Sequence, residues 1–66
     1  MLIIYYFIDD TVTKKAYQNA ADFIGAQLKE VPDLEDYYRI DKVILADQEL
    51  TLKNKTIGGL FDHLNK

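Results

Sequence analysis

Two adjacent carboxylates, Asp9 and Asp10, directly follow an apolar run that extends from Leu2 to Ile8. A carboxylate pair at a strand end can hold Mg2+, because this hard cation prefers oxygen ligands and a strand end is rigid. The same residues are typical of a helix start, where one side chain caps the first turn and the other is a solvated anion near the positive end of the helix. We favour the helix start, and therefore predict neither a metal site nor a cofactor.

A short hydrophobic strand that ends in Asp9 and passes into a helix resembles the start of the small CRISPR-associated Cas2-like nucleases. The likeness covers about the first thirty residues, and its motif is a single aspartate. The resemblance implies a ferredoxin-like fold, a dimer, and metal-dependent cleavage or binding of nucleic acid through Asp9, with Asp10 as a second ligand. The final strand of that fold has no counterpart here, so this reading is the alternative.

Two further groups near the C-terminus could do chemistry. The single histidine, His63, could act as a general acid or base, but the sequence supplies no nucleophile or orienting group, so we interpret it as a side chain at a helix end. Residues 54–59 place a lysine, a hydroxyl and two glycines at a helix start, where free N–H groups can bind phosphate. Because the glycines follow the Lys-Thr pair, the order differs from a P-loop, and we expect close packing there.

The negative charge of the chain is concentrated in residues 30–41. The chain has 11 acidic and 8 basic residues and a net charge of −3, and outside this segment the two signs nearly balance. Carboxylates interleaved with tyrosines suit a basic protein surface, because charge steers association and the rings supply buried area at low entropic cost. A solvated acidic loop is the other interpretation. The residues predicted to contact a partner are Asp33, Glu35, Asp36, Tyr37 and Tyr38.

The elements that position these residues follow from hydrophobic patterning. Residues Leu2–Ile8 are rich in β-branched and aromatic side chains, which predicts a strand that is apolar on both faces. The apolar residues between positions 12 and 28 recur at the spacing that places them on one half of a helix. This pattern predicts a helix that starts at Asp10 or Thr11 and ends near Glu30, before Pro32. Residues 32–36 form an acidic connection.

The second half of the chain predicts a hairpin and a short helix. Strands at residues 37–46 and 49–53, joined at Asp47-Gln48, would set Leu45 opposite Leu50 and Val43 opposite Leu52. Thr56 would cap a helix with an apolar stripe of Ile57, Leu60, Phe61 and Leu64. The order β-α-β-β-α over a single domain, residues 1–66, predicts an α+β fold. We expect a two-layer α/β sandwich in which two helices cover one face of a three-stranded sheet.

Two helices cover one face of such a sheet, which leaves the other face of the first strand exposed. Exposed apolar patches of a few hundred Å2 commonly mark an interface. We therefore predict a homo-oligomer, namely a homodimer, or else a different protein that docks on the open sheet face or on the sheet edge. The other interpretation is that Tyr37, Tyr38 and the hairpin shield the outer face of this strand. The residues assigned to this face are Leu2, Ile4, Tyr6 and Ile8.

Length and composition exclude several function classes. A chain of 66 residues has no room for a deep internal pocket, and the absence of cysteine excludes thiolate catalysis, disulfides and Cys-ligated zinc. No apolar run is long enough to span a bilayer, so we expect a cytoplasmic protein. The net negative charge argues against nucleic acid as partner. We predict a small non-enzymatic protein–protein interaction module, a regulator or inhibitor of a nucleic-acid-handling protein.

Overall fold

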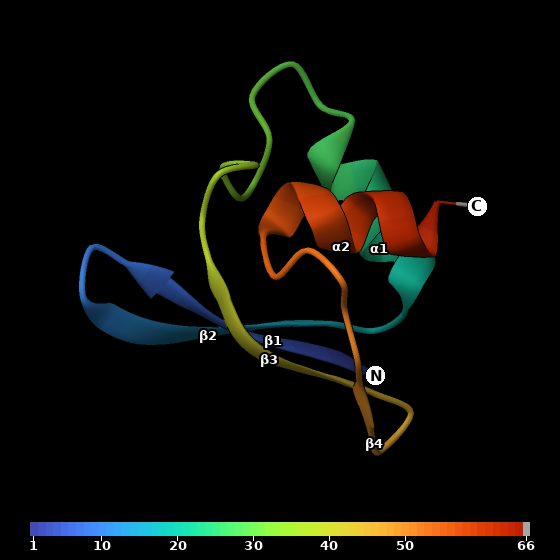
Figure 1. Ribbon diagram of the computed structural model, residues 1–66. Coiled ribbons are helices and arrows are strands. Elements are labelled where there is room, and N and C mark those ends of the chain that lie inside the picture. The colour runs from blue at the N-terminus through green and yellow to red at the C-terminus, as the bar shows by residue number, and fades with distance from the viewer. Residues whose placement is uncertain (66) are drawn as a thin grey trace.

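The computed structural model describes residues 1–65 and shows a β-β-α-β-β-α chain order (Figure 1). The elements are β1 (Leu2–Ile8), β2 (Thr11–Tyr17), α1 (Ala20–Gln27), β3 (Ile40–Leu45), β4 (Gln48–Leu50) and α2 (Ile57–Leu64). The α+β class with two helices is confirmed. The three-stranded sheet and the β-α-β-β-α order were wrong, because residues 1–65 contain a four-stranded antiparallel sheet.

The additional strand is β2, which occupies residues assigned to the first half of a helix. Asp9 and Asp10 form a two-residue turn, and Ile8 pairs with Thr11 across it. Asp9 has φ 54°, a left-handed backbone that aspartate tolerates better than most residues. The β-branched residues that follow favour a strand, so their side-chain type was a better guide than the helical spacing of the apolar positions.

Helix α1 is accordingly shorter than predicted at both ends. It begins after Asn19, whose side-chain Oδ1 accepts a hydrogen bond of 2.9 Å from the backbone N–H of Asp22. This contact satisfies one of the unpaired donors of the first turn. The helix ends at Gln27, well before Pro32, so the proline does not terminate it. Neither α1 nor α2, the two helices within residues 1–65, has the length and apolar character needed to cross a membrane.

The β3–β4 hairpin turns one residue earlier than predicted. Ala46 and Asp47 form the turn with φ values of 53° and 66°. Positive φ at both turn positions matches the twist of the flanking strands, and this favours the observed register. The strands are also shorter than residues 37–46 and 49–53. The cross-strand pairs are Val43 with Leu50, Ile44 with Glu49, and Leu45 with Gln48.

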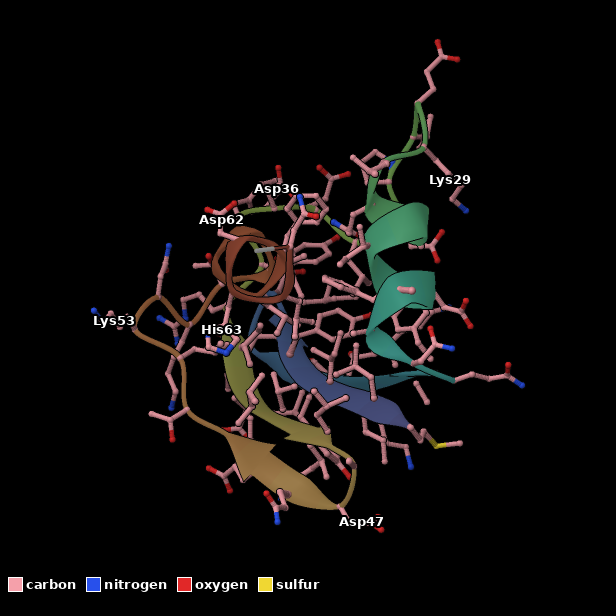
Figure 2. All side chains as sticks on the ribbon, turned by 90° about the vertical axis from the view of Figure 1, so that its right-hand side faces the viewer. Lys29, Asp36, Asp47, Lys53, Asp62 and His63 are labelled. Carbon is pink, nitrogen blue, oxygen red and sulfur yellow. The ribbon has the colours of Figure 1, made fainter. Side chains whose placement is uncertain are left out.

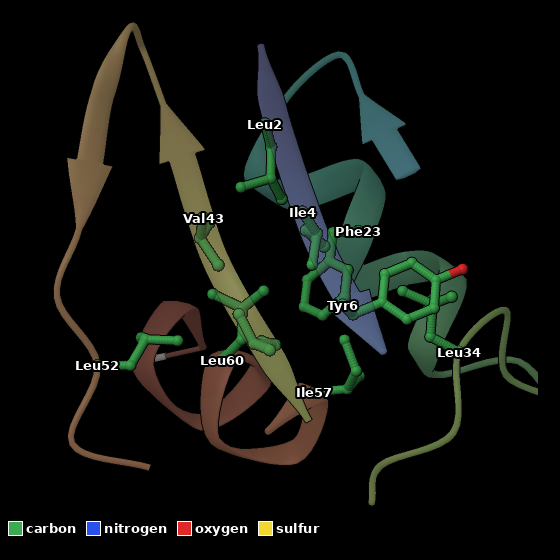
Figure 3. Close-up of a cluster of buried hydrophobic side chains, with 10 residues drawn as sticks. Leu2, Ile4, Tyr6, Phe23, Leu34, Val43, Leu52, Ile57 and Leu60 are labelled. Carbon is green, nitrogen blue, oxygen red and sulfur yellow. The ribbon is translucent and has the colours of Figure 1, made fainter. Parts of the chain in front are cut away.

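The strands lie in the order β2-β1-β3-β4, and both helices lie on one face of this sheet (Figure 1). Between the two layers is one cluster of buried apolar side chains (Figure 3). The cluster contains Leu2, Ile4, Tyr6, Phe23, Leu34, Ile40, Val43, Leu52, Ile57 and Leu60. The predicted helix after Thr56 is confirmed, and its apolar stripe supplies part of this core.

The assignment of the faces of β1 was wrong. Leu2, Ile4 and Tyr6 lie beneath the helices, with exposed fractions of 0%, 0% and 5%, and only Ile8, at 40%, is exposed. The uncovered face of β1 carries its other apolar residues, and the register places lysines from β2 and β3 directly beside them. On β3, Lys42 shares the face of Tyr5 and the apolar Val43 shares that of Ile4, so the face with Lys42 is the one left open to solvent. Self-association through the face of β1 would therefore have to use Ile3, Tyr5 and Phe7.

Candidate functional site

At one end of the sheet, the turn after β1 lies beside the segment that leads into β3. The backbone N–H of Phe7 donates a hydrogen bond of 2.8 Å to the carbonyl of Arg39 and joins the two segments. They form an open cleft of about 470 Å3. Its lining residues are Phe7, Ile8, Asp9, Asp10, Tyr37, Tyr38 and Arg39. The aspartate pair and the two tyrosines, which the sequence presents as separate candidates, thus share one site.

Three tyrosines form a column that runs from the core to the surface at this cleft. Tyr38 stacks on the buried ring of Tyr6 with centroids 5.7 Å apart and an interplanar angle of 21°. Tyr37 then packs edge-on against Tyr38 at 5.3 Å and 72°. Burial, with a further contribution from Tyr38, raises the pKa of Tyr6. This aromatic column begins at Tyr6 in the core and ends at the accessible ring of Tyr37, which is 73% exposed.

The carboxylates of Glu35 and Asp36 lie on the exposed loop beside this column. The loop is held by its backbone, because the carbonyl of Glu35 accepts a hydrogen bond from Tyr38 (3.1 Å) and that of Asp36 accepts one from Gly58 (2.9 Å). Asp36 lies next to α2 in Figure 2. A carboxylate close to a helix N-terminus is stabilised by the helix dipole. Both side chains are exposed, and the two backbone hydrogen bonds define the position of the loop that carries them.

Asp33 is engaged within the fold, unlike its neighbours. Its carboxylate forms a 2.7 Å ion pair with Lys29 and accepts a 3.2 Å hydrogen bond from the Tyr17 hydroxyl. The Lys29 ammonium, aided by this hydroxyl, holds the pKa of Asp33 below its ordinary value of 3.8. Burial, followed by the Asp33 carboxylate, raises the pKa of Tyr17. Of the five residues predicted to contact a partner, Asp33 and the half-buried Tyr38 thus have internal roles.

The Asp33 contacts make a testable contribution to stability. We expect Asp33→Asn to lower the free energy of unfolding at pH 7 by about 0.5 kcal/mol, the size of an exposed ion pair, while keeping an acceptor for Tyr17. Because folding depresses the pKa of Asp33, its contribution is present above the unfolded-state value and lost as the pH falls. The difference between the two proteins should therefore shrink as the pH falls from about 4 to about 2 in urea titrations. A difference that stays constant over this range would contradict the assignment.

Gln27 is a positioning residue that sequence reasoning did not single out. Its side chain is buried, donates a 2.8 Å hydrogen bond to the carbonyl of Leu34, and accepts one of 3.1 Å from the N–H of the same residue. The pair of bonds fastens the loop that carries Glu35, Asp36 and Tyr37 to the end of α1. The sequence feature that could have indicated this role is that Gln27 is polar but interrupts the apolar half of the predicted helix.

The start of α2 shows why the glycine pair does not make a phosphate site. The N–H groups of Ile57, Gly58 and Gly59 donate to Tyr38 O, Asp36 O and Thr56 Oγ1, at 2.9, 2.9 and 3.0 Å. The donors that an anion would need are therefore already used. His63 lies in the last turn of this helix, as predicted, and lines a second open hollow of about 500 Å3 with Asp62 and Lys53. These three side chains are labelled in Figure 2.

The interpretation of Asp9 and Asp10 as a helix start was wrong, because the two residues form the turn between β1 and β2. Both residues line the cleft together with Arg39. Within residues 1–65, no three His, Cys, Asp or Glu side chains are grouped so that they could hold a metal ion. The cleft therefore combines acidic groups, one cation and an accessible aromatic ring, which is a composition suited to binding.

No curated protein and no solved structure matches this sequence. A family model described as "Domain of unknown function (DUF4649)" matches residues 2–66, which includes every element of the fold and the whole of the cleft. The chain therefore belongs to the DUF4649 family.

Proposed function

We propose that this chain is a small protein-binding module that docks a basic surface of another protein at the cleft and its acidic loop. The observation that carries the proposal is the aromatic column, which presents the exposed ring of Tyr37 beside the carboxylates of Glu35 and Asp36. An aromatic ring that is already held in place loses little entropy when it is buried against a partner. The carboxylates around it supply steering toward positive charge.

The nature of the partner follows from the same charges. Asp9 and Asp10 line the cleft and add two carboxylates to those of the acidic loop. Arg39 lines the same cleft and is its cationic residue. Proteins that handle nucleic acids present basic surfaces to phosphate groups, and an acidic module can occupy such a surface. This supports the role of a regulator or inhibitor of a nucleic-acid-handling protein. The alternative, a metal-dependent nuclease that uses Asp9, would have to hold its cation in a cleft whose lining also contains the cationic residue Arg39.

Site-specific photo-crosslinking in cells tests the docking site directly. A photoreactive phenylalanine derivative placed at position 37 should form adducts with a partner protein, because this side chain is 73% exposed at the cleft. The same group at Gln18, an exposed position outside the cleft, is the matched control. Absence of a discrete adduct at position 37, or the same adduct at both positions, would contradict the proposal.

Removal of the loop charges should slow association with the captured partner. We expect the double variant Glu35→Gln, Asp36→Asn to lower the association rate constant by about tenfold at low salt, with the difference fading as salt is raised. The control is Asp22→Asn, Asp47→Asn, which changes the net charge equally; Asp47 lies far from Asp36 in Figure 2. Stopped-flow or surface-based kinetics provide the measurement. Equal rates for the two double variants would refute a role for this loop.

A further inference from the structure

The uncovered face of the sheet carries two aromatic rings on the central strand β1, with cations beside them. Tyr5 pairs directly with Lys14 on β2 and with Lys42 on β3. The Lys42 ammonium lies 4.8 Å from the centroid of the Tyr5 ring. The guanidinium carbon of Arg39 lies 5.5 Å from the centroid of the Phe7 ring. Each ring is thus accompanied by at least one positive charge.

The charge of this open face differs in sign from that of the whole chain. Among the residues that the register pairs on this face, Glu49 on the far strand β4, next to Ile44, is the carboxylate, while Asp41 lies at the bulge of β3 and has no paired residue. The three cations lie around Tyr5 and Phe7. The chain as a whole carries a net charge of −3, so its acidic groups are concentrated elsewhere. The net charge therefore does not describe the potential at this face.

These charges distinguish between the occupants that the open face could accept. A second copy docked face to face would bring two sets of three cations together, and like charges at an interface oppose association. An anionic partner would instead find cations around a flat aromatic surface. Within the open face, Ile3, Ile44 and Val12 add apolar area beside the rings, and Val12 is 50% exposed.

We propose that the open face binds single-stranded nucleic acid, with bases stacked on Tyr5 and Phe7 and phosphates contacted by Lys14, Lys42 and Arg39. The two rings are separated by two residues along a strand, a distance of about 6.6 Å. Stacked bases rise by about 3.4 Å, so two rings at this spacing suit unstacked nucleotides of an extended strand. Stacking platforms bordered by cations are a general device of proteins that bind single strands. The open face meets the acidic cleft at Phe7 and Arg39, which line both, whereas Tyr5, Lys14 and Lys42 belong to the open face and do not line the cleft.

Fluorescence anisotropy with labelled single-stranded DNA and RNA of about 12 nucleotides tests the proposal with the 66-residue chain. At about 50 mM salt we expect saturable binding below about 100 μM, with a slope of log K against log salt of about −2 for three phosphate contacts. In the double variant Lys14→Gln, Lys42→Gln the slope should become less steep and change to about −0.7. The matched control, Lys53→Gln, Lys55→Gln, removes the same charge from residues outside this face and should retain the parent slope.

The aromatic contribution is tested separately, with variants that keep an apolar side chain. Tyr5→Leu should weaken binding by at least about fivefold, whereas Leu28→Ala, which changes an exposed apolar residue at the end of α1 on the other side of the sheet, should leave binding unchanged. Three results of the binding measurements would overturn the proposal. They are no binding of either strand, equal losses in the matched pairs of variants, and equal or tighter binding of poly-glutamate, which would identify an acidic protein as the occupant. Sedimentation that shows a dimer abolished by Tyr5→Leu would assign the face to a second copy instead.

Discussion

The variant Gly59→Ala is expected to destabilise the fold by about 2–3 kcal/mol, because the added methyl group overlaps the backbone of the preceding loop. A Cβ at this position would contact the carbonyl oxygen of Asn54, and would lie 2.8 Å from its Cβ and 3.0 Å from its carbonyl carbon. Atoms of a backbone segment cannot move aside as the end of a flexible side chain can. The helix start would have to shift away from the loop, which would disturb the cap between Thr56 and Gly59.

The neighbouring glycine provides the control. A Cβ on Gly58 would lie 3.4 Å from the carbonyl oxygen of Asp36 and 3.5 Å from its Cβ, which are ordinary contacts. We therefore expect Gly58→Ala to be neutral, or stabilising by up to about 1 kcal/mol through its higher helix propensity. Urea denaturation followed by circular dichroism measures both variants. If the two alanines had equal effects, the close approach at Gly59 would not be the reason for its glycine.

The second large effect is expected for Gln27→Met, which keeps the length of the side chain and removes its hydrogen-bonding groups. The free energy of unfolding of the variant should be lower by about 2–4 kcal/mol. The reason is that the N–H and the carbonyl of Leu34 would each lose their hydrogen bond to the buried Gln27 side chain. Leu34 is itself 4% exposed, so water cannot easily replace these bonds. The loss would be a large share of the stability of so small a domain.

Hydrogen exchange separates this mechanism from general destabilisation. The amide of Leu34 should lose protection in Gln27→Met by more than the global change in stability accounts for, because its acceptor is removed. Gln18→Met, at an exposed glutamine, should change neither stability nor exchange. Retained protection of Leu34 in Gln27→Met would show that the side chain does not hold this loop.

Both variants act on the loop that carries the proposed docking residues. Gln27 fastens the loop at Leu34, and the start of α2 fastens it at Asp36 and Tyr38 through the N–H groups of Gly58 and Ile57. Between these attachments lie the side chains of Glu35 and Tyr37. The position of the acidic loop is therefore fixed from both ends, and partner binding should weaken wherever either attachment is removed.

The parts of the fold that could be predicted are those set by neighbouring residues. The strand Leu2–Ile8 was confirmed because seven consecutive β-branched, aromatic or aliphatic residues favour no other element. The helix capped by Thr56 was confirmed because cap and apolar stripe lie within three turns of one another. The segment 11–17 was wrong because its apolar residues fit a helical spacing while its β-branched residues fit a strand, and the turn at Asp9-Asp10 decided between them.

The candidate site could be predicted only in part, for the same reason. The residue types of Glu35, Asp36 and Tyr37 identified an exposed acidic segment, and the structure leaves these three side chains accessible on the loop. The internal roles of Asp33 and Tyr38 could not be predicted, because they depend on contacts with Tyr17 and Tyr6 from other elements. Nor could the cleft itself, which needs the first hairpin to place its turn beside this loop.

By itself the sequence determined the apolar character of β1, the Thr56 cap and the location of the excess negative charge, all of which depend on residue type and near neighbours. Only the tertiary structure decided which face of β1 is buried and which presents Tyr5 and Phe7. A strand that is apolar on both faces gains hydrophobic free energy from burial of either one. The choice rests with the register of β3, which sets the charged Lys42 beside Tyr5 and the apolar Val43 beside Ile4, and that register is a long-range property of the folded chain.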